Sequence, residues 1–347
     1  MAESNSQPVA KEAEERKRFS LWTVYRYQKV MWRVVLATVP AMLAAIYFFG
    51  WRALAVIALS IAAGSFVEWL FCRARKEPIS SAVFVTAILY ALTLPPHVPY
   101  YVELVGIVVA IMFGKEVFGG YARNIFNPAL VGRCFVYICF PVDMTAHWLA
   151  PYTSWPGGLA HWVKGVDAFT RATPLTVFKS GEGLQPLGNL LFGYTGGSLG
   201  ETSALLIIIG GIYMMVTRTA NWRITAGCLI GAVTASVFYG LVGSTAVPGP
   251  LFTVLAGGFM FGAVYMATDP ISAAQTNPGR WIFGIEVGVL TVIIRGFSNF
   301  NGAVMFAILL GNMFSPIMEY YLRAYKQWQR ERAKPVAQQK ATEGEAA

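Results

Sequence analysis

Ten apolar stretches dominate this sequence, and most are close to the length that crosses a lipid bilayer. Roughly 20 apolar residues in an α-helix cross a hydrocarbon core of about 30 Å. Of the 347 residues, 56% are hydrophobic and 13% are charged, which is too little charge to cover a soluble protein of this size. The sequence therefore predicts an all-α integral membrane protein. The ten predicted transmembrane helices are residues 33–50, 53–72, 79–95, 101–115, 128–142, 202–218, 222–243, 250–268, 280–296 and 300–322.

The distribution of lysine and arginine predicts the orientation of these spans. Cytoplasmic loops of membrane proteins carry an excess of both residues. With cytoplasmic N- and C-termini in a bacterial inner membrane, only five of the 27 lysines and arginines lie on the other side. These five are Arg52, Lys164, Arg171, Lys179 and Arg295. The net charge of +9 follows from this orientation, so membrane lipid is the expected partner and nucleic acid is not.

The order of the spans predicts an internal duplication. Five spans, a long external loop and five more spans give an odd number per half, so the halves would be inverted relative to each other. Basic residues interrupt the apolar and aromatic residues 19–33, which is typical of an interfacial amphipathic helix. The predicted organisation is a cytoplasmic segment with this helix (1–32), a first repeat (33–142), an external loop (143–201), a second repeat (202–322) and a cytoplasmic basic tail (323–347).

Two spans carry proline at matching places in the two halves. Pro95 and Pro96 close the third span, and Asp269-Pro270 closes the eighth. Helices broken in this way supply free carbonyls near the membrane midplane, although simple helix termination is the alternative. A carboxylate beside such a break is costly in lipid unless it faces a cation or a cavity. Asp269 with free carbonyls therefore suits a hard cation such as sodium.

Several other ionisable residues lie in or beside the predicted spans. Buried charge in lipid is expensive, so such residues usually face a cavity, a partner or a cofactor. Arg133 and Glu319 have a simpler alternative, in which the side chain reaches back to the membrane surface. Besides these two and Asp269, the group consists of Glu68, Lys115, Glu116, Glu286 and Arg295.

The external loop contains a polar stretch, residues 167–175, with hydroxyls close to a carboxylate. A hydroxyl outside any span, such as that of Thr173, is a candidate for covalent attachment of a group. The simpler interpretation is that Thr173 caps a short helix with Pro174 at its first position. The residue pattern alone leaves both interpretations open.

Three long blocks carry a resemblance to a known family. They are residues 113–133, 261–284 and 307–319. They include the sequence motifs Lys-Glu-Val-Phe-Gly-Gly and Met-Ala-Thr-Asp-Pro. Together with residues 28–32 they closely resemble NqrB, a membrane subunit of the sodium-translocating NADH:quinone reductase. The same family includes RnfD of the related Rnf complex. The amino-acid sequences of the three blocks are more similar to the quinone-reductase subunit than to RnfD. The resemblance covers roughly residues 25 to 322.

The resemblance implies a covalent FMN on the external loop. Family members carry FMN in a phosphoester bond to threonine within an Asp-x-x-Ser/Thr-Gly-Ala-Thr motif. Asp167, Thr170, Ala172 and Thr173 match this motif, with Thr173 as the attachment residue, while Arg171 replaces the usual glycine. An arginine here could hinder recognition by the flavin transferase or pair with the phosphate.

The resemblance also implies a non-covalent riboflavin, quinone reduction and sodium translocation. Gly119, Gly120, Phe135 and Tyr137 fall where quinone-site residues are expected. The ion pathway would use Asp269 with Glu319, and Glu77 on the inner loop. No catalytic residue and no metal ligand is assigned.

Other functions stay open at this point. Inverted halves with broken helices also suit a non-redox channel, and a scaffold for cofactors held elsewhere is a further alternative. An Rnf-type ferredoxin:NAD oxidoreductase is the alternative within the family. The chain has no Gly-x-Gly-x-x-Gly after a strand with which to bind NADH. Other membrane, flavin and iron–sulfur subunits are therefore expected to deliver its electrons.

Overall fold

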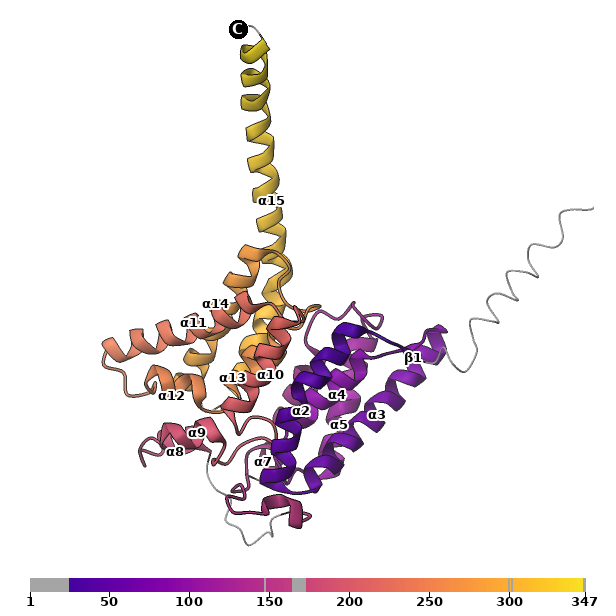
Figure 1. The fold of residues 1–347 in the computed structure, drawn as a ribbon, viewed down its shortest axis with the longest axis vertical. Helices are drawn as coiled ribbons and strands as arrows, with labels where there is room; N and C mark the ends of the chain where they lie inside the picture. Colours follow the sequence, from indigo (N-terminus) through magenta and orange to yellow (C-terminus); the bar gives the residue numbers. More distant parts are fainter. Residues whose placement is uncertain (1–24, 147, 164–172, 299, 301, 346–347) are drawn as a thin grey trace, which may run out of the picture.

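The apolar stretches fold into a helical bundle, seen in Figure 1 of a computed structural model. The structure describes residues 25–146, 148–163, 173–298, 300 and 302–345. Each of the ten predicted spans contains at least one helix. In the first half these are α2 (Lys29–Phe49), α3 (Arg52–Arg75), α4 (Ala82–Leu92), α5 (Tyr100–Ile111) continued by the π-helix η2 (Met112–Glu116), and α6 (Pro128–Cys139).

The second half has the same number of segments, but one of them is broken. The eighth predicted span is divided into α12 (Pro250–Leu255), α13 (Phe259–Phe261) and the π-helix η4 (Gly262–Met266). The remaining segments are α10 (Ala204–Val216), α11 (Trp222–Leu241), α14 (Asn277–Phe297) and α15 (Ala303–Glu345). Between the halves lie α7 (Pro141–Thr145), the 3-10 helix η3 (Gly157–Ala160), α8 (Pro174–Lys179) and α9 (Leu187–Phe192).

Four helices of the described part are long and apolar enough to cross a bilayer: α2, α3, α11 and the Ala303–Arg332 portion of α15. Shorter apolar helices, namely α4, α6 and α10, complete the bundle. This composition confirms a helical membrane protein with several spans. We call the end from which α15 projects the inner end, and the opposite end, where α8 and α9 lie, the outer end (Figure 1).

Two sequence expectations differ from the structure at the inner end. Tyr25–Arg26 forms a short strand, β1, paired in parallel with Ile79–Ser80 (β2), and α2 begins only at Lys29. The interfacial helix expected over residues 19–33 is therefore not continuous, and residues before Tyr25 lie outside the described part. The last helix also extends beyond the span predicted to end at residue 322, because α15 continues to Glu345.

Glycines allow α11 and α14 to pack closely. Gly227 and Gly231 on α11 face Gly284 and Gly288 on α14, and a Cβ atom at Gly284 would lie 2.5 Å from the Ile224 carbonyl oxygen. Four-residue spacing of small residues on both helices brings the two backbones together, which is a common packing mode in membranes. This contact fixes α14, which carries Arg295 near its end, against α11.

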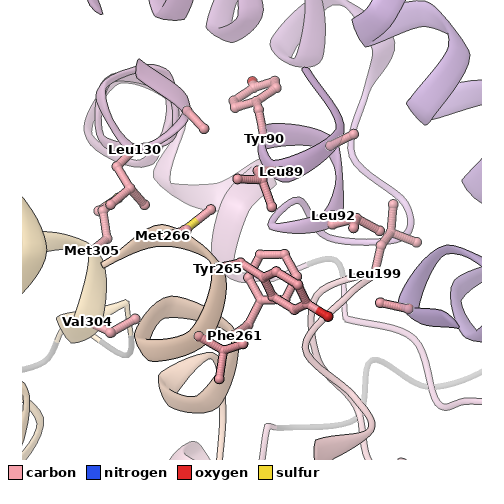
Figure 2. Close-up of a cluster of buried hydrophobic side chains, with 14 of the residues drawn as sticks. Leu89, Tyr90, Leu92, Leu130, Leu199, Phe261, Tyr265, Met266, Val304 and Met305 are labelled. Carbon is pink, nitrogen blue, oxygen red and sulfur yellow. The ribbon is translucent and has the colours of Figure 1, made fainter. Parts of the chain in front are cut away.

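Side chains from the two halves meet in one buried apolar cluster (Figure 2). Figure 2 shows Leu89, Tyr90 and Leu92 from α4 facing side chains of α6, α13, η4 and α15. The hydroxyl of Tyr90 donates to the Glu103 carbonyl, and that of Tyr265 donates to the Ala37 carbonyl 2.9 Å away. Each tyrosine hydroxyl therefore has an acceptor on a neighbouring helix, α5 for Tyr90 and α2 for Tyr265, and is not left unpaired in the bundle.

Candidate functional site

An open cavity, with about 740 Å³ of space including the part open to solvent, lies at the outer end. We call it the outer cavity. Segments far apart in the sequence form its wall: α6, the start of α8, the Gly-rich turn before α10, and the break between α12 and α13. Its lining includes Arg133, Tyr137, Thr173, Ser198, Glu201 and Gly257.

Thr173 lies on the wall of the outer cavity and is 8% exposed. It is the N-cap of α8, with Pro174 at the first helical position, as the simpler sequence interpretation predicts. The Thr173 Oγ1 atom lies 2.9 Å from Thr176 Oγ1 and accepts from the Thr176 amide at 3.4 Å. Capping and attachment are compatible, because an ester oxygen can still accept the Thr176 amide hydrogen bond. Asp167, Thr170, Arg171 and Ala172 lie outside the described residues.

A buried ion pair lies in the outer cavity. The Arg133 guanidinium donates to Glu201 Oε1 at 2.7 Å, and Ser198 donates to Glu201 Oε2 at 2.8 Å. Arg133 is 6% exposed, so its side chain does not reach back to the membrane surface as the sequence alternative proposed. Its Nε has no partner among the described residues. Sequence reasoning missed Glu201, whose signal is a single carboxylate in a Gly-rich turn just before a span.

A second cavity, of about 620 Å³, lies at the inner end, and we call it the inner cavity. Both π-helices contribute to its wall, Lys115 from η2 and Tyr265 from η4. π-Helical turns are often found at functional sites. Apolar residues of Figure 2 separate the two cavities, since Leu89 lines the inner one and Val304 lines the outer one.

Asp269 lines the inner cavity in the turn that follows η4. Its carboxylate accepts from the Ile271 amide at 3.3 Å and from the Ser272 hydroxyl at 2.8 Å. These contacts stabilise the turn, so a cap role and an ion role are both chemically possible for this carboxylate. In the described part of the chain, no three His, Cys, Asp or Glu side chains gather as a metal site would require.

Glu319 closes the other end of the same turn. Its Oε1 accepts from the amides of Gln275 and Thr276, at 2.9 and 2.7 Å, and from the Thr276 hydroxyl. The side chain is 7% exposed and satisfies the start of α14, so it does not reach back to the surface either. Asp269 and Glu319 therefore contact opposite ends of the turn that joins η4 to α14. Glu77 lies elsewhere, half exposed beside Arg75 at 3.4 Å.

The four residues expected at a quinone site are not brought together. Gly119 and Gly120 have φ values of 104° and 91° and form the turn after η2 at the inner end. A side chain at either position would contact an arginine, so the glycines are explained by this turn. Tyr137 lines the outer cavity and packs against Phe300 and Phe306, whereas Phe135 is 39% exposed on α6. The four residues do not line one common cavity.

Lys179, at the end of α8, shows how positive the surroundings of the outer cavity are. Its Nζ donates to the Ser298 carbonyl at 2.8 Å. Partial burial, followed by the nearby positive charge of Arg295, lowers the pKa of Lys179. Lys179 and Arg295 thus place two positive charges near each other at the end of α8.

Comparison with known proteins identifies the relatives of this chain. The profile described as the NQR2, RnfD, RnfE family matches residues 22–327. The NqrB subunit of the Na(+)-translocating NADH-quinone reductase of Azotobacter vinelandii is 39% identical over 282 residues, which cover 78% of this chain and 66% of the relative. A Pseudomonas aeruginosa PAO1 protein with the same description is 39% identical over 272 residues, covering 75% of this chain and 64% of the relative.

A second kind of relative matches over more of its length. The RnfD subunit of the ion-translocating oxidoreductase complex of Ectopseudomonas mendocina is 38% identical over 313 residues, covering 86% of this chain and 91% of the relative. This chain thus spans about two thirds of the length of the quinone-reductase relatives and most of the length of the RnfD relative. Identity alone does not separate the two kinds.

Proposed function

This chain belongs to the NQR2, RnfD, RnfE family, and from that premise we propose that it carries FMN covalently on Thr173. In this proposal it is the membrane flavoprotein subunit of an ion-translocating oxidoreductase complex and works only together with partner subunits. The observation that carries the proposal is the position of Thr173. Thr173, on a matched motif, lies in the wall of the outer cavity, beside the buried pair of Arg133 and Glu201.

The residues of the outer cavity fit such a group. When bound, FMN would supply an acceptor and donor of electrons at the outer end of the bundle. Thr173 would hold the phosphate, and the Thr176 hydroxyl would remain within hydrogen-bond distance of the ester oxygen. Arg133, whose Nε is unpaired among the described residues, would orient the ligand from the cavity floor, with Glu201 fixing the guanidinium. Tyr137 and Pro174 would exclude water from the apolar part of the ligand.

Mass spectrometry of the peptide that contains Thr173 tests this function directly. The peptide should carry the mass of FMN, and the chain should fluoresce yellow in a denaturing gel. A channel or a scaffold without redox cofactors would show neither signal. The resemblance also implies a non-covalent riboflavin, which should appear as a second flavin when the native protein is extracted with acid.

Two kinds of complex are compatible with this site. We propose NADH:quinone oxidoreduction coupled to sodium translocation, because the sequences of the three blocks are more similar to the quinone-reductase subunit. The fuller match in length to an RnfD relative favours an Rnf-type complex as the second candidate. Purification of the native complex separates them, since quinone reduction by NADH supports the first and exchange of electrons with ferredoxin supports the second.

We further propose that the outer end faces the periplasm. A cysteine at Ser180, exposed at the end of α8, should then react with an impermeant thiol reagent in whole cells. One at Gln327, exposed on α15, should react only after the membrane is opened. Cys139 is exposed and should first be replaced by serine. The reverse labelling pattern would contradict the orientation and, with it, the external flavin.

At the inner cavity we propose that Asp269 contributes to ion binding. Asp269→Asn should raise the sodium concentration needed for quinone reduction by about tenfold to a hundredfold, since a hard cation loses a charged ligand. The reduction of the flavins by the donor should be nearly intact. Ser272→Ala is the matched control, because it removes a contact of the carboxylate and keeps its charge. Unchanged sodium dependence in the Asn variant would leave Asp269 as a turn cap only.

A further inference from the structure

Arg295, near the end of α14, is a buried cation with two unused hydrogen-bond donors among the described residues. It is 4% exposed, its Nη1 donates to the Thr253 carbonyl at 2.8 Å, and its guanidinium lies 5.8 Å from the centre of the Phe259 ring. Its Nε and Nη2 have no partner in the described part of the chain. Burying guanidinium donors without hydrogen-bond acceptors is costly, so the free Nε and Nη2 of Arg295 suit an anionic acceptor.

The Arg295 guanidinium lies behind the wall of the outer cavity, in contact with Gly257, on the side where α8 begins. Gly257, which lines the cavity, separates the guanidinium from α8. A Cβ atom at Gly257 would lie 3.3 Å from Arg295 Nη2 and 3.0 Å from Leu175 Cδ1. Leu175 closely follows Thr173 in the chain. Arg295 is therefore close to the start of α8, whose residues Thr173 and Leu175 line the cavity.

The charges of the described residues around this part of the cavity do not balance. Arg133 and Arg295 contribute two buried positive charges, and Glu201, bound to Arg133, contributes the negative charge that faces them. The positive charge of Arg295 is left over. A phosphodiester carries one negative charge and oxygens that accept two parallel N–H bonds from one guanidinium, which suits the free Nε and Nη2 of Arg295.

We propose that Arg295 is the counterion and positioning residue for the phosphate of the flavin nucleotide in the outer cavity. The inference rests on the proposed flavin site and goes beyond the attachment residue. Gly257 has a role in it, since any side chain there would fill the space between the phosphate and the guanidinium. Arg133 and Glu201, deeper in the cavity, are left to contact the rest of the ligand.

Binding of free flavins to the full-length Thr173→Ala protein in lipid nanodiscs tests this role. FMN and riboflavin differ only by the phosphate, so the ratio of their dissociation constants isolates the phosphate contact. FMN should bind about tenfold to a hundredfold more tightly than riboflavin, as expected for charge-assisted contacts to phosphate. Inorganic phosphate should compete with FMN and leave riboflavin binding unchanged.

Arg295→Gln in the same background should bring the ratio close to one. Arg280→Gln, the same charge change at the inner end of α14, should keep the full preference. Arg295→Lys retains the charge and loses the two-donor geometry, so it should lower the preference severalfold. If the Arg295→Gln protein does not insert into the membrane, the Arg295→Lys protein is measured in its place. An unchanged preference of the Arg295→Lys protein for FMN over riboflavin would then overturn the proposal.

The remaining outcomes are equally decisive. A preference that survives Arg295→Gln, or that is lost with Arg171→Gln instead, assigns the phosphate to another residue and overturns the inference. Failure of the covalent site alone would look different. In that case the wild-type chain would lack gel fluorescence, while the preference for FMN would still depend on Arg295.

Discussion

Replacing Thr173 by asparagine is expected to abolish covalent flavin fluorescence completely while the protein still inserts at a normal level. Asparagine is a good N-cap, so α8 keeps its start, but it offers no hydroxyl to form a phosphoester. Alanine should also abolish the fluorescence, at an added cost of about 1 kcal/mol for the lost cap. Fluorescence in a denaturing gel, normalised to an immunoblot of membrane fractions, measures both effects.

Two matched variants show whether the loss is specific to the attachment oxygen. Thr176→Val removes the hydroxyl that lies 2.9 Å from Thr173 Oγ1, and it should leave the flavin attached. Thr170→Ala, within the matched motif, should only weaken the signal. Full fluorescence in the Thr173→Asn protein would place the covalent flavin on another residue and remove the basis of the proposed function.

Breaking the buried ion pair of Glu68 and Lys115 is expected to give the largest loss of stability. Lys115 Nζ lies 2.5 Å from Glu68 Oε2, and the two side chains are 2% and 1% exposed. Glu68 Oε1 also accepts from the amide and hydroxyl of Ser80 in β2. Glu68→Leu removes the carboxylate that binds the buried ammonium directly, which should cost about 3–5 kcal/mol. Such a loss would lower the melting temperature by on the order of 10 °C.

The double variant Glu68→Leu with Lys115→Met should recover much of this stability, because neither charge is then buried alone. Glu77→Gln is the control for an exposed pair, with Glu77 3.4 Å from Arg75, and should change stability by less than about 1 kcal/mol. Tryptophan fluorescence during heating in detergent measures all three proteins. A Glu68→Leu protein as stable as the wild type would show that Lys115 finds another partner or loses its proton.

The sequence predicted the elements of this fold well, because they depend on local composition. Runs of apolar residues of spanning length define helices almost without regard to context in a membrane, where every backbone group must be paired. Each of the ten expected spans contains a helix, and the break at Asp269-Pro270 follows η4 directly. The Asn and Thr residues that begin α6 and α14 cap them beside proline, as their type predicts.

The family and the candidate attachment residue were also within reach of the sequence. The long ordered blocks carried the resemblance, and the family profile confirms it. Thr173 could be singled out as a hydroxyl outside the spans, but its place in the wall of a cavity could not. That place depends on segments from α6 to α15 converging on it, and such contacts have no signature in local periodicity.

Only the tertiary structure decided which buried charges are paired. From the sequence, the side chains of Arg133 and Glu319 could either reach the membrane surface or face a buried partner. In the structure, Arg133 binds Glu201, and Glu319 caps the turn before α14. Arg295 is left with two free donors, among the described residues, beside the outer cavity. A sequence determines the number and spacing of charges along each helix. The partner of each charge depends on how helices distant in sequence pack, because ion pairs form over a few ångströms in space and are indifferent to separation along the chain.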